Sequence, residues 1–155
     1  MRIAADVMGG DSGCAVIIGG LLKAIDRHDT IQTMYLVGDE DTIRPALGQA
    51  GHLASRIEVV HSPEVLSMEE KPVVGLRRKK NCSLAMATDL VKHGQADAVL
   101  SAGNTGGMVA AATIKLRTLP GVDRPGIATV MPTKTGNFVL LDAGANVEGK
   151  PRHLM

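Results

Sequence analysis

Residues 101–107 read SAGNTGG and stand between two apolar stretches, ADAVL at 96–100 and MVAAATIKL at 108–116. This order predicts a strand, a tight loop of small residues and a helix that begins at once. Asn104 or Thr105 would cap the helix. The first N–H groups of a helix have no partner within it and carry partial positive charge, so they attract an anion.

The composition of the loop supports the same interpretation. It holds three glycines, Gly103, Gly106 and Gly107. Their missing side chains would let a ligand approach the main chain closely, and the hydroxyls of Ser101 and Thr105 would add hydrogen-bond donors. The loop is therefore predicted to bind an oxyanion, with phosphate as the leading candidate. The alternative is that the glycines only permit a tight turn and close helix packing.

Outside this loop, apolar strands and amphipathic helices alternate along the chain. Strands are expected at residues 2–6, 31–38, 56–61 and 97–101. Between the first two, apolar residues recur with helical spacing at Ile18, Leu21, Leu22 and Ile25. Ser83 is expected to cap a later helix that closes near Gly94.

Two further strands are expected at 127–133 and 137–142, where the intervening KTGN could close a hairpin. Alternating strands and helices predict an α/β fold, a three-layer αβα arrangement around a mostly parallel sheet. Ligands of such sheets bind beyond the carboxyl ends of the strands. Three glycine-containing loops follow strands here: DVMGGD at 6–11, SAGNTGG at 101–107 and DAGAN at 142–146. We expect all three on one edge of one sheet, around a shared site.

The polar residues of the other two loops have several possible roles. Gly9 and Gly10 would expose the main chain to an anion, and Asp6 and Asp11 flank them. The two carboxylates could bind a metal, act as a base or order the loop, and for Asp6 the ordering role is favoured.

In the third loop, Asp142 and Asn146 form a similar arrangement. His61 ends a strand, where a structural histidine is more common than a catalytic base.

Composition excludes several classes of function. The net charge of +1 gives no reason to expect a nucleic-acid partner, and one Tyr, one Phe and no Trp leave few rings for stacking on bases. The loops match neither the dinucleotide-binding nor the Walker pattern, so a nucleotide cofactor is disfavoured. Cys14 and Cys82 lack ligand-spaced histidines, which favours two buried thiols in a cytoplasmic protein over a metal site.

A basic run, Arg77, Arg78, Lys79 and Lys80, follows Lys71 in the proline-containing segment 62–81. It would be a solvated helix face or a surface that steers phosphate or an acidic protein partner. Arginine suits bidentate contacts with phosphate, whereas lysine acts as a point charge.

Five stretches resemble, in the same order, the bacterial phosphate acyltransferase family. They are RIAADVMGGD at 2–11, EKPVVGLRRKK at 70–80, ADAVLSAGNTGGMVAA at 96–111, GVDRPGIATVMPT at 121–133 and LLDAGANVEGKP at 140–151. The resemblance implies transfer of a fatty acyl group from acyl carrier protein to inorganic phosphate, giving acyl phosphate for phospholipid synthesis. It also implies an isopropylmalate-dehydrogenase-like and phosphotransacetylase-like fold, a homodimer, and neither metal nor cofactor.

Members of that family continue into a second stretch of comparable length, so residues 1–155 are expected to be the N-terminal portion of such a domain, with the fold incomplete at the C-terminus. The missing part would supply helices that meet the membrane, which implies a cytoplasmic protein that associates peripherally with its inner face or with a membrane acyltransferase. Two alternatives stay open: a non-catalytic fragment that binds phosphate or carrier protein, and a phosphotransacetylase that uses a coenzyme A thioester.

The hypothesis for the site follows from this resemblance and from the loops. Asn104, Thr105 and the Gly106 main chain would hold phosphate or the oxyanion, and Lys71 or Arg78 would neutralise charge. Asp142 and Asn146 would orient the site, and Asp11 is a lesser candidate for proton transfer.

Overall fold

The computed structural model describes residues 1–48 and 51–143. The chain divides into two compact units, Met1–Leu116 and Arg117–Met155, and each is described by itself.

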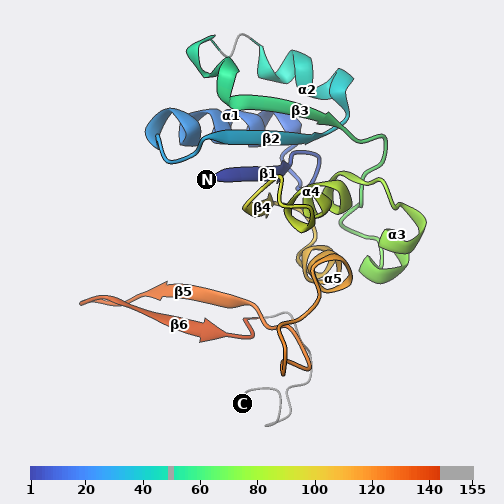
Figure 1. The fold of residues 1–155 in the computed structure, drawn as a ribbon, viewed down its shortest axis with the longest axis vertical. Coiled ribbons are helices and arrows are strands. Elements are labelled where there is room, and N and C mark those ends of the chain that lie inside the picture. The colour runs from blue at the N-terminus through green and yellow to red at the C-terminus, as the bar shows by residue number, and fades with distance from the viewer. Residues whose placement is uncertain (49–50, 144–155) are drawn as a thin grey trace. The chain divides into compact units, whose positions relative to one another are not determined.

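The first unit is built on a four-stranded parallel sheet (Figure 1). Its strands are β1 (Arg2–Asp6), β2 (Thr33–Gly38), β3 (Ile57–His61) and β4 (Ala98–Ser101). They lie in the order β3-β2-β1-β4, and every neighbouring pair is parallel. The four strands expected from the sequence are therefore confirmed, and β1 lies inside the sheet.

Helices cover both faces of this sheet. One face packs against α1 (Cys14–Arg27), α2 (Glu40–Leu47) and the short 3-10 helix η1 (Gly51–Arg56). The opposite face packs against α4 (Ser83–Lys92). Because successive residues of a strand point to opposite faces, Ala5 joins the first cluster and Ala4 the second. These three layers confirm the predicted αβα arrangement.

Two more helices extend the layer that contains α4. They are α3 (Pro72–Arg78), in the segment that interrupts the strand–helix rhythm, and α5 (Thr105–Lys115), the alanine-rich helix after β4. Leu66, Leu76, Leu84 and Ala111 form a small apolar cluster between these helices. The segment 62–81 therefore packs against α4 and α5 through its apolar residues Leu66 and Leu76.

The predicted cap of α4 was wrong by one residue. Cys82 occupies the position before the helix, and Ser83 is its first residue. Ser83 is buried, and its hydroxyl is without a hydrogen-bond partner in the described structure. Burial of the thiol raises the pKa of Cys82, which fits the expectation of a buried thiol.

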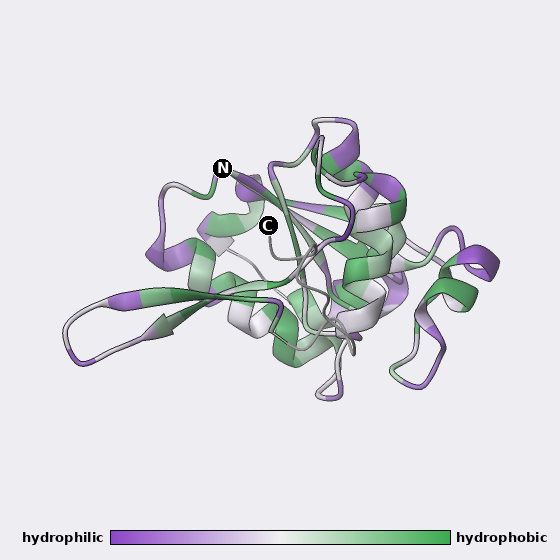
Figure 2. Cartoon of the chain, turned by 90° about the horizontal axis from the view of Figure 1, so that it is seen from below, coloured by the Kyte–Doolittle hydropathy of each residue, from purple (hydrophilic) through white to green (hydrophobic). Residues whose placement is uncertain are grey.

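The second unit contains β5 (Ala128–Pro132) and β6 (Asn137–Leu141), which pair antiparallel. The Thr133 N–H donates to the Gly136 carbonyl over 2.8 Å, which confirms the expected hairpin. Hydrophobic colour runs along most of both strands in Figure 2, although their side chains are largely exposed. One expectation was wrong: the loop after β6 does not follow a strand of the parallel sheet, because β6 belongs to a separate sheet.

An ion pair aligns β1 with β4 at the amino ends of the two strands. The Arg2 main-chain N–H and guanidinium both donate to the Asp97 carboxylate over 2.7 Å, and the Asp97 N–H donates to the Arg2 carbonyl over 2.8 Å. The hydrogen bond from the Arg2 side chain is the main cause that lowers the pKa of Asp97 to about 2.

Because this pKa is lower in the folded protein than in the unfolded chain, the ionised pair stabilises the fold above about pH 4 and loses its effect as the pH falls towards 2. We predict that Asp97→Asn lowers the thermal midpoint at pH 7 and that the difference from the wild type shrinks near pH 2. Thermal unfolding at pH 7, 4 and 2.5 measures this. Asp123→Asn, at an exposed carboxylate, is the control, and a gap that stays constant with pH would contradict the assignment.

Candidate active site

Two of the predicted loops meet where β1 and β4 end. The strands are adjacent and parallel, and their register places Asp6 opposite Ser101. The chain leaves both residues at the same edge of the sheet, so residues 7–13 and 102–104 lie together. The shared edge predicted for these two loops is confirmed.

The Asp6 carboxylate joins the two loops. Its Oδ1 accepts the main-chain N–H groups of Gly9 over 3.1 Å and Met8 over 3.3 Å. Its Oδ2 accepts the Ser101 hydroxyl over 2.8 Å, and the Ser101 oxygen in turn accepts the Gly103 N–H over 3.1 Å. Asp6 is only 4% exposed. The loop-ordering role favoured for Asp6 is confirmed, and we call Asp6, Ser101, Gly9 and Gly103 the Asp6 clamp.

The glycines of the clamp are required by this close approach. A Cβ at Gly9 would lie 2.6 Å from Asp6 Oδ2 and 3.1 Å from the Gly103 Cα. Gly10 has a φ of +105°, and a Cβ there would lie 3.0 Å from the Ala102 carbonyl oxygen. These glycines therefore allow one loop to pack against the other.

Asn104 caps α5, which decides between the two capping candidates. Its Oδ1 accepts the Gly107 N–H over 2.9 Å, and its Nδ2 donates to the Met68 carbonyl over 3.0 Å. The next glycines face the same segment, because a Cβ at Gly106 would lie 3.1 Å from Pro72 and one at Gly107 would lie 2.7 Å from Leu66. The start of α5 is thus packed against residues 62–81.

The remaining donors at this helix end belong to two residues. The Gly107 N–H donates to the cap, and the Met108 N–H donates to the Asn104 carbonyl. Within residues 1–48 and 51–143, the N–H groups of Thr105 and Gly106 and the Thr105 hydroxyl make no hydrogen bond, and both residues are exposed. The open hydrogen-bond donors at this helix start are therefore those of Thr105 and Gly106.

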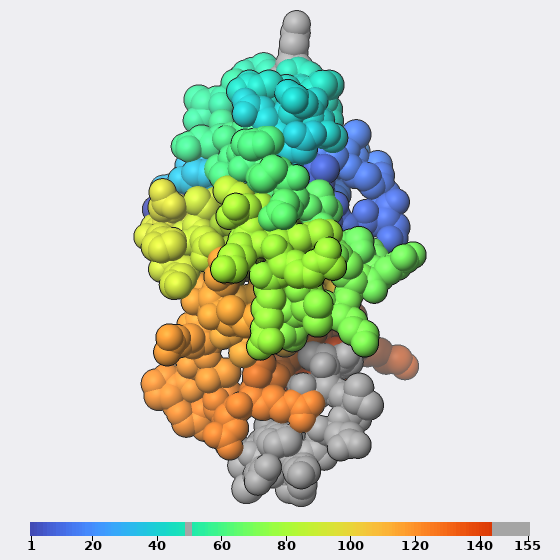
Figure 3. Space-filling view, turned by 90° about the vertical axis from the view of Figure 1, so that its right-hand side faces the viewer, coloured from blue at the N-terminus to red at the C-terminus, as the bar shows by residue number. Residues whose placement is uncertain are grey.

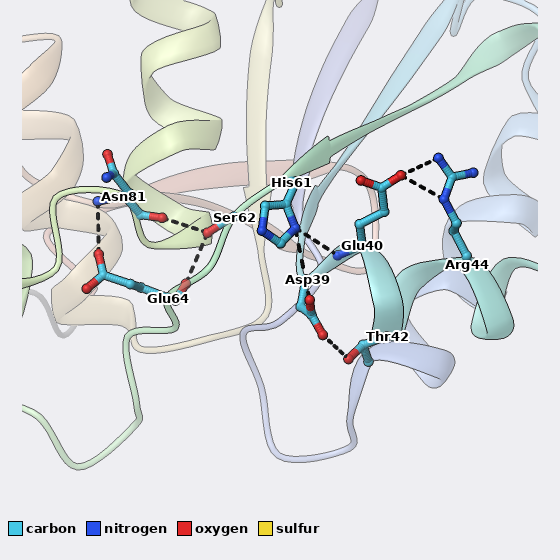
Figure 4. Close-up of polar contacts among 8 residues, drawn as sticks. All are labelled: Asp39, Glu40, Thr42, Arg44, His61, Ser62, Glu64 and Asn81. Atoms are coloured by element: carbon cyan, nitrogen blue, oxygen red, sulfur yellow. Dashed lines mark hydrogen bonds and ion pairs between the residues drawn. The ribbon is translucent and has the colours of Figure 1, made fainter.

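Figure 4 shows how the segment 62–81 is closed at its base. The Ser62 hydroxyl donates to the carbonyls of Asn81 over 2.7 Å and Glu64 over 3.1 Å, and the Asn81 N–H donates to the Glu64 carboxylate. The two ends of the segment that contains α3 are thus joined to each other.

The basic run divides into one internal and several external charges. The Lys79 ammonium donates to Glu70 over 2.7 Å and to the Val65 carbonyl over 2.8 Å. This contact is the main cause that lowers the pKa of Glu70. Arg77, Arg78 and Lys80 of the run are exposed, as is Lys71 before it, and none of the four forms an ion pair with another described residue. Lys79 therefore holds its own segment together, while these four face solvent.

His61 also has a structural contact (Figure 4). Its Nδ1 accepts the Glu40 N–H over 3.2 Å and lies 4.0 Å from an Asp39 carboxylate oxygen. The Thr42 hydroxyl donates to Asp39 over 2.6 Å and is the main cause that lowers the pKa of Asp39. These contacts are of the kind expected for a structural histidine.

Asp11, Asp142 and Asn146 are the remaining predicted site residues. Asp11 is exposed in the loop after β1. Asp142 belongs to the second unit, where it has a φ of +58°, and Asn146 lies outside the described residues. Among the residues described, no three His, Cys, Asp or Glu side chains gather as a metal site would require.

Two features of the site were missed from the sequence. Ser101 was expected to face a ligand, but its hydroxyl is used by Asp6. Asn104 was expected to donate to an anion, but its amide binds Met68 and Gly107. The DVMGGD and SAGNTGG stretches hold no signal for the contact between Asp6 and Ser101, which depends on the strand order that places β1 beside β4.

Comparison with known proteins supports the family resemblance of the loop sequences. A family model described as a fatty acid synthesis protein matches residues 1–155. The chain is 47% identical over 155 residues to a protein of Akkermansia muciniphila named phosphate acyltransferase, covering all of this chain and 44% of that protein. Equally named proteins of Pelotomaculum thermopropionicum and Desulfitobacterium hafniense are 47% and 45% identical over 155 residues, with 44% and 46% of their lengths covered.

The chain belongs to the phosphate acyltransferase family. It spans less than half the length of these curated relatives. These relatives are named for an acyltransferase activity, and the matching family model is named for fatty acid synthesis. No helix in the described part of the chain is long and apolar enough to cross a membrane.

The packing of the clamp leads to a prediction about stability. Gly9→Ala would place its methyl group against the Asp6 carboxylate and Gly103, so we expect a loss of about 1–3 kcal/mol in the free energy of unfolding. Gly20→Ala is the matched control, because a Cβ at Gly20 in α1 meets nothing within 4 Å. We expect it to stabilise the fold by up to about 1 kcal/mol. Urea unfolding of both variants measures the difference, and equal effects would contradict the clamp.

Proposed function

We infer that the protein containing this chain transfers a fatty acyl group from acyl carrier protein to inorganic phosphate and so forms an acyl phosphate. The observation that carries this proposal is the exposed start of α5, where Thr105 and Gly106 keep uncommitted donors beside the clamped loops. The relatives are named phosphate acyltransferase, which suggests phosphate as the ligand of these donors. Phosphate is an anion of the kind that a helix start attracts.

The reaction needs positioning more than an activated nucleophile. A phosphate oxygen attacks the thioester carbonyl carbon, the carbon–sulfur bond breaks, and the carrier leaves as a thiolate. Holding the two reactants in line can lower the barrier by about 7–11 kcal/mol. A donor placed on the developing oxyanion contributes about 3–4 kcal/mol. In this proposal the N–H groups of Thr105 and Gly106 and the Thr105 hydroxyl hold the phosphate.

Other residues have supporting roles in the proposal. Asn104 positions the donors by capping α5, and Lys71 and Arg78 neutralise charge or attract the acidic carrier. Asp11 would transfer a proton, and Asp142 with Asn146 would orient the substrates. We also propose, from the family resemblance, a homodimer that contacts the inner face of the membrane peripherally.

Thr105→Val tests the phosphate donors, because it removes the hydroxyl and keeps the side-chain shape. In the complete natural polypeptide that contains residues 1–155, we expect the KM for phosphate to rise about tenfold with an unchanged thermal midpoint, since the loss of one hydrogen bond to a charged group is worth about 1.5–3 kcal/mol. Steady-state release of carrier thiol at varied phosphate measures it. A KM for phosphate equal to that of the wild type would remove the hydroxyl from the site.

Asn104→Asp and Asn104→Ser separate capping from charge. Both new side chains retain a capping oxygen and both lose the amide that donates to Met68, so the structural losses are matched, and thermal midpoints of the two variants check this. The carboxylate would repel phosphate, so we expect Asn104→Asp to lose far more phosphate-dependent turnover than Asn104→Ser. Equal losses in the two variants would contradict an anion at this helix start.

The choice of acyl donor is tested with the wild-type protein. Acyl thioesters of carrier protein and of coenzyme A are compared with and without phosphate. Turnover only with the carrier thioester and phosphate is expected. Preference for coenzyme A would assign a small-molecule phosphotransacetylase, and binding without turnover would assign a non-catalytic role.

A further inference from the structure

A cavity of about 270 Å³ lies between α3 and α5, away from the clamped loops. Its lining residues are Leu76, Arg77, Lys80, Ala111, Ile114 and Lys115. The two helices pack against each other, and Figure 3 shows the α3 region directly against the side chains of α5 on this face. The cavity therefore belongs wholly to the first unit.

The cavity combines an apolar floor with a basic rim. Leu76 and Ala111 are buried, while Ile114 is 52% exposed and forms an apolar wall that faces solvent. Lys115 is neutralised by Asp89, whose carboxylate lies 2.5 Å from the ammonium. Arg77 and Lys80 are exposed and form no ion pair with any residue that the structure describes. The rim thus carries two uncompensated positive charges beside an open apolar surface.

We propose that this cavity docks an acidic helix of the acyl carrier, with one apolar side chain seated on the floor and carboxylates paired to Arg77 and Lys80. The proposal rests on the proposed function, because that function supplies an acidic protein partner. Because the rim is positively charged, it would attract a partner with negative charge. The cavity is smaller than the 300–1,000 Å³ that is usual for small-molecule sites, and it suits an anchoring side chain of a helix that lies in a groove.

The cavity and the proposed phosphate donors lie on the same helix, α5. Ile114 lies nine residues after Thr105 on the same helix, which is about 14 Å along its axis. A carrier helix held at the cavity would therefore deliver its thioester on a tether that spans this length of α5. The rigid helix sets the separation between the docking surface and the phosphate donors.

The test uses Lys80→Glu and Ile114→Glu in the complete polypeptide, with Lys23→Glu and Val16→Glu as matched controls. The control residues are exposed on α1, so they introduce the same charges elsewhere. Binding of acyl-free acyl carrier protein is measured by calorimetry at several salt concentrations, and thermal midpoints verify folding. We expect each cavity variant to raise the Kd at least tenfold and each control to change it less than twofold. Lys80→Glu should also flatten the dependence of Kd on salt.

Ile114→Ala extends the test to a variant that adds no charge, and a smaller rise in Kd is expected. Unchanged carrier binding in folded cavity variants, with Thr105→Val still impaired towards phosphate, would overturn the docking site and leave the proposed function standing. A wild-type protein that neither binds carrier nor turns over its thioester would overturn both. If the cavity variants lose binding to phosphatidylglycerol vesicles and keep carrier binding, the surface meets a membrane and the proposal is wrong.

Discussion

The buried carboxylate of Asp6 is the contact on which the rest of the site depends. A buried carboxylate is costly unless hydrogen bonds satisfy it, and here two main-chain N–H groups and the Ser101 hydroxyl do so. Those donors come from two loops that are almost a hundred residues apart in the chain. The loops must therefore pack tightly, which requires glycine at positions 9 and 103. Their packing in turn sets where α5 begins.

Glycines that suggest an open anion site are used here largely for internal packing. Gly9 and Gly103 bring the loops together, and Gly106 and Gly107 admit the side chains of Pro72 and Leu66. The Asn104 side chain is occupied at both ends. What remains for a ligand is a small set of donors at Thr105 and Gly106, supported by neighbours that are already satisfied. A site arranged in this way is preorganised, because binding an anion breaks none of the contacts that hold it.

Helix α5 connects the separate features of the first unit. Its start carries the candidate anion donors, its middle packs against α4 through Ala111, and its end forms a wall of the cavity beside α3. The segment 62–81 is closed on itself at Ser62 and by the Lys79–Glu70 contact. It meets α5 through the Met68 carbonyl, which accepts the Asn104 amide, and through Leu66 and Leu76. Family membership agrees with this arrangement, since the matching stretches of sequence include both loops and the segment itself.

Local pattern alone determined the four parallel strands, the start of α5 next to its small-residue loop, and the antiparallel hairpin, because hydrophobic period and turn chemistry act between near neighbours in the chain. The family was indicated by the resemblance of five stretches to known members and not by these patterns. Only the tertiary structure decided that the Ser101 hydroxyl donates to Asp6 and that Lys79 pairs with Glu70. It also decided that β6 is not part of the parallel sheet. These facts depend on which distant residues become neighbours once the strands are ordered, and spacing along one chain does not specify that order.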